Sequence, residues 1–512
     1  MKGIIAKILK IFLYLAFALI FVFLVLQLFF KQEFYNIFSA ISQKSQVTKV
    51  GELLTVVYFN EATSLEPAMQ ISNNREKVVN IYEPLVKPDR DLKMKSALAL
   101  SWGLIDDLTW EFNLRPDVLF HDGSLFDAND ALVSINRALT LPGSDLSDFL
   151  SVIDNVEIID DMTIRVHTKK PDPLLLNKLS TVLMMPSEYE GKEILNPVGT
   201  GPYIFQEWQK DKEMIVLAFD KYWGDAPHFK KVKLIPMIDK NDRVALLVNG
   251  EADLLTYVPF DAIEYLVQEK MNIEPIPSLE VAFMAYNVSS KAMSGVNFRK
   301  ALSLALDVKS FLELLGNYAR PVSQFVSNGV FGFNPNIPEH EYDLEMAKKL
   351  IDEGSFDGRT IVFALPKELE MLGEFVRTSL EKVDISAIIS YVDYDEYFAE
   401  LKSGKSDIYF LGFKGDLGDS GDFFNQFVAS SAELNLTGYK NPRVDDLIEA
   451  SLVELNLEKR RNYLQEIMKI IVEDDVLGLP LYEYETIYAF NHKIDYQPRI
   501  DGFVYFDDVI PK

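Results

Sequence analysis

The residues best suited to chemistry lie in one short loop, Lys414-Gly-Asp-Leu-Gly-Asp-Ser-Gly-Asp422. This loop holds three carboxylates and three glycines in nine positions. Glycine lets a backbone or a ligand approach closely, because it carries no bulky side chain. A carboxylate in a site closed away from water forms a strong, charge-assisted hydrogen bond to an ammonium group. The loop therefore predicts close approach to a ligand, and its position in the loop makes Asp416 the carboxylate that we favour for ligand contact.

The other two carboxylates of this loop have a structural alternative, since Asp is a preferred helix N-cap. Phe423 starts an apolar stretch, so we expect Asp422 to cap a helix that begins there. Asp419 is then expected to order the loop.

Catalytic and metal chemistry find little support in the residue types. Gly418-Asp-Ser-Gly421 matches part of a trypsin-type serine protease motif, but no His and Asp in matching context accompany it. Gly404-Lys-Ser406 lacks the earlier glycine of a phosphate-binding loop. The five histidines are scattered without metal-ligand spacing, and His121 in Phe-His-Asp-Gly favours a turn role. We expect no catalytic residue, no metal site and no cofactor.

The strand that must position the loop is predicted over Asp407–Phe413, and ligands in open α/β sheets bind beyond the carboxyl ends of strands. Residues 360–413 read as strand, helix, strand, helix, strand, with the earlier strands at Ile361–Leu365 and Ile385–Tyr391. This alternation predicts an α/β lobe whose strands are at least partly parallel.

A second informative segment runs from Asn196 to Asp253. Its Gly199, Gly201 and Pro202 mark a turn, because Gly and Pro favour backbone angles that regular strands avoid. Three strands and a helix ended by Gly250 are predicted after it, at Tyr203–Trp208, Met214–Phe219, Val232–Ile238 and Asn241–Val248. Earlier in the chain, Asp127 is predicted to cap a helix whose first turn contains Asp130.

Several motifs occur in a characteristic order: Tyr82-Glu-Pro-Leu-Val86, Phe120-His-Asp-Gly123, Asn196-Pro-Val-Gly-Thr-Gly-Pro-Tyr203 and Lys221-Tyr-Trp-Gly224. Together they resemble the pattern of family 5 extracellular solute-binding proteins, the peptide- and nickel-binding group that serves ABC importers. The resemblance extends over residues 53–510.

This resemblance implies an α/β fold of the periplasmic-binding-protein type II kind, with a ligand cleft between two lobes. The two crossover strands are expected near Val281–Asn287 and Leu479–Tyr488. The implied boundaries are residues 51–282 for lobe I, with an extra subdomain at about 80–190, 283–487 for lobe II, and 488–512 for the return to lobe I.

The resemblance also implies ligand-contacting positions. Phe413 and Asp416 match a Trp and an Asp in peptide-binding relatives, where the Asp pairs with the peptide α-amino group, and Gly415 lies between them. Tyr286 and Asn287, at a crossover, either line the cleft or serve the hinge. Glu61 follows the first strand, where relatives pair backbone with an extended peptide.

The composition narrows the environment and the partners. The formal net charge is −26, so nucleic acid is disfavoured because its phosphates would be repelled. The sequence contains no cysteine, which excludes disulfides, thiolate metal sites and a lipid-modified N-terminal cysteine.

The N-terminal segment predicts a membrane anchor. Residues 11–30 are almost entirely apolar, and twenty helical residues span about 30 Å, the thickness of a bilayer core. Lys2, Lys7 and Lys10 keep residues 1–10 cytoplasmic, so the body is exported and residues 31–50 form a tether. A cleaved signal peptide is the alternative, but the apolar run is long for one and Phe38 spoils the small-residue cleavage site before Ala40.

We therefore expect a membrane-tethered, monomeric, extracytoplasmic protein that is no enzyme and that delivers oligopeptides to the permease and ATPase subunits of an ABC transporter. Two alternatives stay open. The same fold could bind a nickel chelate or another solute, or the protein could be a peptide sensor or chaperone without a transport role.

Overall fold

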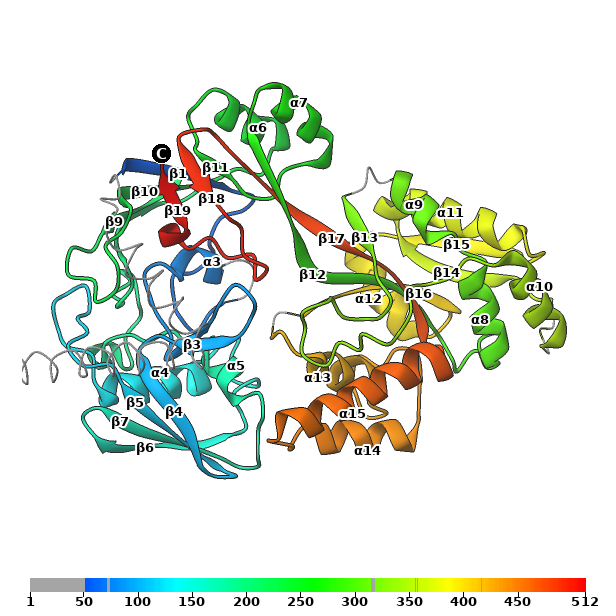
Figure 1. Cartoon of the computed structure of the whole chain (residues 1–512), viewed down its shortest axis with the longest axis horizontal. Coiled ribbons are helices and arrows are strands. Elements are labelled where there is room, and N and C mark those ends of the chain that lie inside the picture. Colours follow the sequence, from blue (N-terminus) through cyan, green and yellow to red (C-terminus); the bar gives the residue numbers. More distant parts are fainter. Residues whose placement is uncertain (1–50, 71–73, 315–317, 355, 357, 416) are drawn as a thin grey trace, which may run out of the picture. The chain divides into compact units, whose positions relative to one another are not determined.

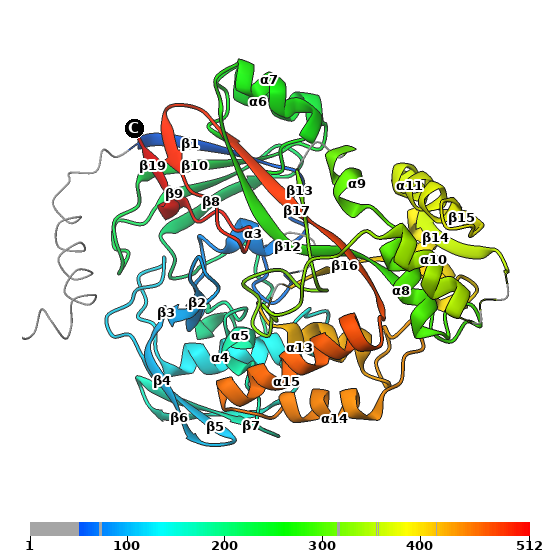
Figure 2. The same cartoon turned by 45° about the vertical axis from the view of Figure 1, so that its right-hand side comes forward.

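One ladder of strands runs through the residues that the computed structural model describes, 51–512 without 71–73, 315–317, 355, 357 and 416. The order of this sheet is β15-β14-β16-β12-β17-β11-β1-β10-β9-β8, and β13 (Ala319–Pro321) pairs with β17 outside that path. Its two central strands are long and antiparallel, β12 (Asn272–Tyr286) and β17 (Gly478–Phe490). They run side by side between the two lobes (Figures 1 and 2).

These two strands are the crossovers. β12 pairs with β17 beside lobe I over residues 272–277, and from Glu280 onward it also pairs with β16 of lobe II. The register shifts between Pro277 and Val281, so the changeover between lobes falls there, before the predicted Val281–Asn287. The second crossover also extends beyond the predicted Leu479–Tyr488, to Phe490.

Lobe I is built on a strand that is buried on both faces, β1 (Gly51–Tyr58). Leu54 and Val56 pack into one core and Val57 into another, as expected of a parallel strand covered on both sides. β1 runs parallel to β10 and β11, and β9 and β8 continue the sheet antiparallel. The strands and helices of this part are β8 (Tyr203–Gln209), β9 (Glu213–Ala218), β10 (Phe229–Pro236), α6 (Lys240–Val248), β11 (Leu254–Leu255), η2 (Phe260–Ala262) and α7 (Ile263–Gln268). The predicted three strands and helix are confirmed to within three residues at each end.

The C-terminal residues return to lobe I. Tyr496, Phe506 and Val509 are buried in the same core as Leu54. The elements here are β18 (Ile494–Tyr496), η6 (Phe506–Asp508) and β19 (Val509–Pro511).

A subdomain of lobe I has its own four-stranded antiparallel sheet, in the order β4-β5-β7-β6, packed on helix α4 (Ala128–Thr140). Asp127 caps α4 by accepting from the backbone of Asn129 and Asp130, and the Asp130 carboxylate returns a bond to the Asp127 backbone. The predicted cap is confirmed. The remaining elements of this part of lobe I are α3 (Asn74–Val78), which precedes the subdomain, and β2 (Val86–Pro88), β3 (Met94–Ser96), β4 (Ala99–Asp106), β5 (Thr109–Leu114), β6 (Ile153–Asp160), β7 (Thr163–Thr168), α5 (Leu175–Leu179) and η1 (Ser187–Tyr189).

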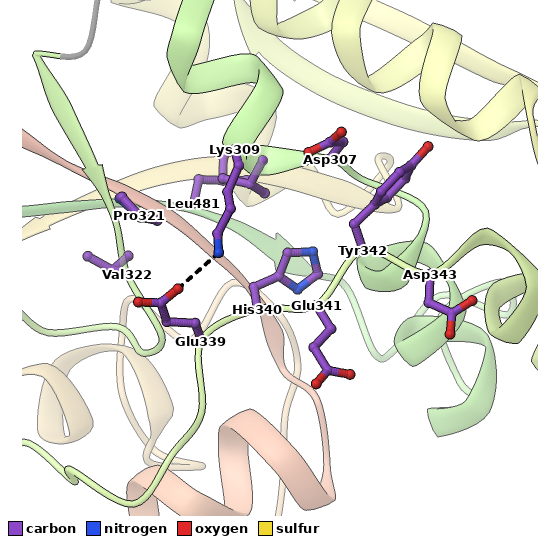
Figure 3. A pocket seen from close by; sticks show the side chains of 11 residues that line it. Asp307, Lys309, Pro321, Val322, Glu339, His340, Glu341, Tyr342, Asp343 and Leu481 are labelled. Atoms are coloured by element: carbon purple, nitrogen blue, oxygen red, sulfur yellow. Dashed lines mark ion pairs between the residues drawn. The ribbon is translucent and has the colours of Figure 1, made fainter.

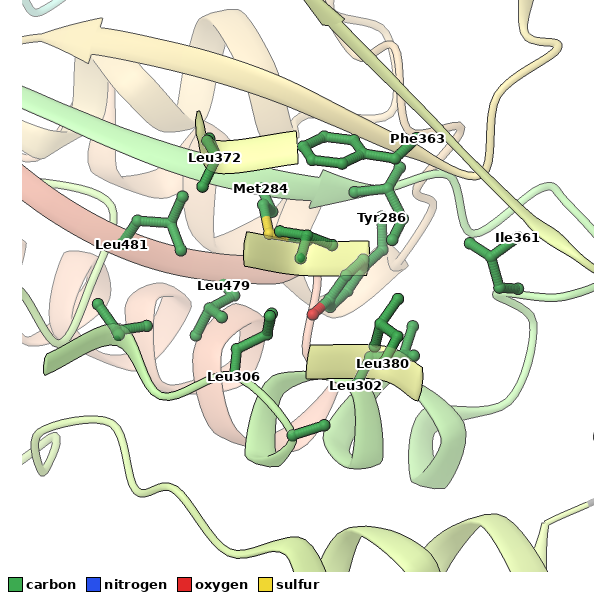
Figure 4. Close-up of a cluster of buried hydrophobic side chains, with 14 of the residues drawn as sticks. Met284, Tyr286, Leu302, Leu306, Ile361, Phe363, Leu372, Leu380, Leu479 and Leu481 are labelled. Carbon is green, nitrogen blue, oxygen red and sulfur yellow. The ribbon is translucent and has the colours of Figure 1, made fainter. Parts of the chain in front are cut away.

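Lobe II is the predicted α/β lobe, since β14 (Ile361–Pro366) runs parallel to both β15 (Ala387–Val392) and β16 (Ile408–Lys414). One face of the sheet packs on α8 (Val296–Leu304), α9 (Val308–Leu314), α10 (Leu344–Glu353) and α11 (Glu370–Glu381), and Figure 4 shows this core. The other face packs on α12 (Tyr394–Ser403), α13 (Ser420–Phe423), η4 (Phe424–Val428), α14 (Pro442–Ser451), α15 (Leu457–Lys469) and η5 (Ile470–Asp474). A short turn of helix, η3 (Lys367–Leu369), follows β14.

No helix within the described part of residues 51–512 is long and apolar enough to cross a bilayer. The predicted anchor at 11–30, the cytoplasmic end and the tether at 31–50 lie outside the described residues.

Candidate ligand site between the lobes

A cavity of about 500 Å³ lies between lobe I and lobe II. Sites for small ligands usually have volumes of roughly 300–1,000 Å³. Lobe I contributes most of the wall, from α3, the subdomain, the turn after β11 and the C-terminal segment: Gln70, Arg75, Glu76, Asp145, Leu146, Phe149, Thr181, Tyr257, Asp501, Gly502 and Phe503. Lobe II and the crossover contribute Leu279, Lys414, Leu417 and Asp422.

The wall carries charges of both signs. Its carboxylates come from both lobes, since Glu76, Asp145 and Asp501 belong to lobe I and Asp422 to lobe II. Arg75 and Lys414 bring the positive charges, again one from each lobe. A ligand that bears both an ammonium and a carboxylate finds complementary groups in such a cavity.

The neighbours that hold the Arg75 guanidinium at the wall include Ser180 and Phe503. The guanidinium donates to the backbone oxygen of Ser180 at 2.9 Å, and it lies over the Phe503 ring, 4.9 Å from the ring centre. A planar guanidinium held in this way is pre-organised to bind a carboxylate through two parallel hydrogen bonds.

Glu76 is a buried carboxylate whose neighbours come from both lobes. Burial raises the pKa of Glu76, while the adjacent Lys77 and, from lobe II, Lys414 act to lower it. Lys77 forms a buried ion pair with Glu76, and its ammonium lies over the Tyr58 ring, 4.1 Å from the ring centre. Lys414 thus acts on Glu76 from the opposite lobe, with a smaller effect on the pKa than burial or Lys77.

The predicted binding loop reaches this cavity. Lys414, Leu417 and Asp422 line it, and the Asn177 side chain of the subdomain donates to the Leu417 backbone oxygen at 2.8 Å. The Gly415 N–H donates to the Leu279 oxygen at 3.0 Å, which ties the loop to the first crossover. Asp416 lies outside the described residues, so its ligand contact stays a prediction.

Phe413 packs inside lobe II. Only 6% of it is exposed, and its ring meets Phe423 and Phe427 edge to face at 5.1 and 5.7 Å. Gly415 has little free space, because a Cβ placed on it would lie 3.3 Å from Val330. In this structure Phe413 therefore supports the loop from beneath.

The expected helix cap was assigned to the wrong carboxylate. Asp419, and not Asp422, caps α13, since its side chain accepts from the Gly421 N–H at 2.8 Å. The helix starts three residues earlier than predicted because Arg460 of α15 holds the Asp419 carboxylate in a buried, bidentate ion pair at 2.5 and 2.8 Å. Asp422 lies in the first turn and accepts from Gln426.

The protease-like Ser420 has none of the features of a nucleophile. It is fully buried, and among the described residues its hydroxyl has no hydrogen-bond partner, so no histidine is placed to activate it. Within the same part of the chain, no group of three or more His, Asp and Glu side chains is placed to hold a metal ion.

The remaining predicted site residues have structural partners. The Tyr286 hydroxyl is buried in lobe II with Ser303 at 3.0 Å, and the Asn287 amide donates to the Ser406 oxygen at 2.9 Å (Figure 4 labels Tyr286). Glu61 accepts from the Trp208 indole at 2.8 Å, away from the residues that line the cavity. These contacts match the hinge alternative for Tyr286 and Asn287, and their ligand contact stays a prediction.

The motifs that carry the family resemblance meet in a scaffold inside lobe I. Glu83 accepts from the Thr200 hydroxyl, the Tyr222 hydroxyl and the Trp223 indole at 3.0, 2.8 and 2.8 Å. His121 accepts from the Gly199 N–H and donates to the Gly201 oxygen, and burial lowers its pKa to about 4, so it is neutral. The turn role predicted for His121 is confirmed.

Sequence reasoning missed Arg75 and Glu76. They lie on α3, which has five residues and is too short for a helical periodicity to show. The only signal was the run of charged residues Arg75-Glu-Lys77 between the polar Ser72-Asn-Asn74 and the apolar Val78-Val79, which is equally typical of a solvated turn.

Another cavity, of about 320 Å³, lies within lobe II and beside the second crossover (Figure 3). His340 there contacts the Leu306 oxygen at 3.0 Å, and burial lowers its pKa, while Lys309 pairs with Glu339 at 3.2 Å. Lobe II and the second crossover supply the whole of this wall, which shares no residue with the interlobe cavity.

The comparisons with known proteins agree with this architecture. The family model for the middle region of bacterial extracellular solute-binding proteins, family 5, matches residues 93–435. The glutathione-binding protein GsiB of Pectobacterium atrosepticum is 28% identical over 429 residues, which cover 78% of this chain and 83% of that protein. The dipeptide-binding protein of Escherichia coli is 25% identical over 434 residues, covering 76% and 81%. Among solved structures, the ABC transporter substrate-binding protein CtaP of Listeria monocytogenes is similar with a TM-score of 0.82 at 23% identity, over 90% of this chain and 100% of that one.

Proposed function

Since this chain belongs to family 5 of the bacterial extracellular solute-binding proteins, we propose that it captures short peptides between its lobes and delivers them to an ABC importer. Two relatives are named for glutathione and for a dipeptide, and both ligands are short peptides. In this role the chain is a binding protein and not an enzyme, and a separate ATPase supplies the energy of transport.

The observation that carries the proposal is the charge pattern of the interlobe cavity. A peptide in its zwitterionic form presents an ammonium at one end and a carboxylate at the other. Arg75 and Lys414 can receive the carboxylate, while the ammonium can pair with the acids of the wall or with Asp416 of the loop. Each lobe supplies groups of both signs, so a bound peptide bridges the lobes.

This bridging explains how binding would control the shape of the protein. A ligand favours the closed arrangement only to the extent that it binds that arrangement more tightly. Here the extra contacts come from bringing Lys414 and Asp422 of lobe II to the lobe I wall, by bending at the two crossovers.

Isothermal titration calorimetry on the purified full chain in detergent tests the ligand class. We expect saturable binding of at least some dipeptides, tripeptides or glutathione, and weaker binding when both peptide termini are blocked. Failure of every peptide pool, alongside binding of a nickel chelate or another solute, would show that the peptide assignment is wrong.

We also propose that residues 11–30 anchor the chain in the cell membrane, with residues 51–512 on the extracytoplasmic side. The apolar run and the lysines before it support this orientation. Alkaline washing should leave the full chain in the membrane and release a variant that lacks residues 1–50. An N-terminus sequenced after residue 30 in the mature protein would instead indicate a cleaved signal peptide.

A further inference from the structure

A third cavity, of about 750 Å³, borders the crossover strands on the lobe II side. Its wall is rich in aromatic and aliphatic side chains, among them Tyr394, Phe398, Leu369, Phe410, Leu411 and Tyr484. Glu280 and Glu368 supply its charged groups. The composition suits a bulky apolar group better than an ion.

The cavity lies where open α/β sheets usually bind their ligands. Pro366 is the last residue of β14, Tyr394 opens the helix that follows β15, and Gly412 is close to the end of β16. The wall is thus built at the carboxyl ends of the three parallel strands of lobe II.

Two of the rings are exposed to an unusual degree. Tyr394 is 75% exposed and Phe398 47%, although both are large and largely apolar. Tyr397, between them, is buried, and its hydroxyl donates to the Ala364 and Phe410 oxygens at 3.1 and 2.8 Å. Tyr397 is therefore used by the fold. The Phe398 ring has the Lys402 ammonium over it, 4.7 Å from the ring centre, whereas Tyr394 leaves most of its ring surface open at the cavity.

This cavity adjoins the interlobe cavity across the ladder of β12 and β16. Leu279 lines the interlobe cavity and the next residue, Glu280, lines the aromatic one. On β16, Lys414 lines the interlobe cavity and Gly412 lines the aromatic one. These two residues are about 7 Å apart along the strand. One residue of an extended peptide covers roughly 3.5 Å. A peptide held at the interlobe cavity can therefore place a nearby side chain in the aromatic cavity.

We propose that the aromatic cavity, lined by Tyr394 and Phe398, is a subsite for a bulky apolar side chain of the bound peptide. It makes the chain selective for peptides that carry an aromatic or large aliphatic residue over peptides of small residues. The inference rests on the proposed peptide-binding function and adds the side-chain class.

Calorimetry on the full chain with tri-alanine and with its three single-phenylalanine derivatives tests the subsite. At least one derivative should bind about tenfold tighter than tri-alanine, because burial of a phenylalanine ring is strongly favourable. In the double variant Tyr394→Ala/Phe398→Ala, the dissociation constant of tri-alanine divided by that of the tightest phenylalanine derivative should fall to about one. The control is Tyr265→Ala on α7, which removes a comparably exposed ring outside both cavities and should keep the ratio of the unmodified chain.

The outcomes separate the two proposals. Peptide binding without preference for phenylalanine, or a preference that survives in the double variant, overturns the subsite and leaves the proposed function standing. Failure of all four peptides and of every other peptide pool overturns both. Circular dichroism melts of the variants show whether a lost preference reflects unfolding, and a single tyrosine variant, Tyr394→Ala, then decides the matter because this ring is the more exposed one.

Discussion

Asp416 is the residue whose predicted role is the most specific. Its loop neighbours Lys414 and Leu417 line the interlobe cavity, which supports the expectation that this loop meets the ligand. We expect Asp416→Ala to weaken peptides with a free amino terminus by about tenfold or more, since a hydrogen bond between charged groups contributes about 1.5–3 kcal/mol. Calorimetry with free and N-acetylated forms of one peptide measures the effect.

The matched control for Asp416 is Asp154→Ala, which removes an exposed carboxylate from the subdomain. It should leave both dissociation constants unchanged. Equal losses for the free and acetylated peptides in Asp416→Ala would contradict a role in binding the amino group.

Asp507 is a buried carboxyl that should make stability depend on pH. Its pKa is raised from 3.8 to about 7, chiefly by burial; Lys87 acts to lower the pKa and Glu83 acts to raise it. The folded state therefore holds a proton that the unfolded state has released, so stability decreases as pH rises from 3.8 to about 7. In Asp507→Asn, thermal melts across this window should show a smaller decrease in Tm. An unchanged pH profile would mean that Asp507 does not carry the effect.

At the scale of elements, the glycines of the turn before β8 are required by close packing. A Cβ on Gly199 would lie 2.1 Å from the Ile81 backbone oxygen, and one on Gly201 would lie 2.6 Å from that of Asn80. Gly199→Ala should lower the free energy of unfolding by about 1–3 kcal/mol, because the backbone has to move. Gly103→Ala is the matched control, since nothing lies within 4 Å of its Cβ position. Denaturation measurements that give the same free energy of unfolding for the two variants would contradict a need for glycine at position 199.

The cap of α13 allows a second test at this scale. Asp419→Ala removes both the cap and the partner of buried Arg460, and loss of one member of a buried ion pair destabilises by about 3–5 kcal/mol. Asp422→Ala, on the same turn, should destabilise much less because Asp422 is not the cap. Urea unfolding of the two variants measures the difference, and the reverse order would restore the original assignment of the cap.

At the scale of the whole described unit, the contact between Asn177 and Leu417 joins the subdomain of lobe I to the predicted binding loop of lobe II. The sequence has no cysteine, so a pair introduced as Asn177→Cys and Leu417→Cys reports on the lobes without interference. We expect the oxidised variant to exchange bound peptide far more slowly than the same protein after reduction, because opening at the crossovers is blocked. Equal exchange rates in a variant shown to be cross-linked would contradict lobe opening as the route of the ligand.

Local patterns in the sequence were enough to predict the strands of lobe II, the Asp127 cap and the turn role of His121. Each of these depends on residues close together in the chain or on a periodicity within one element. The position of the aromatic cavity could not be inferred in this way, because its wall combines α12, two crossover strands and the end of β14, which only the sheet pairing brings together.

The motifs in their order determined the family and the two-lobe architecture, and the pattern after β16 indicated the loop that lines the interlobe cavity. Only the tertiary structure showed which side chains of lobe I share the cavity wall with the loop after β16. Arg75 and Glu76 lie more than three hundred residues before Lys414, and they share a cavity wall with it only because β12 and β17 hold the lobes together. It also decided that Asp419 is the cap, since the choice depends on Arg460 from a distant helix. Long-range contacts of this kind leave no periodic trace in the sequence, because each partner alone reads as an ordinary solvated charge.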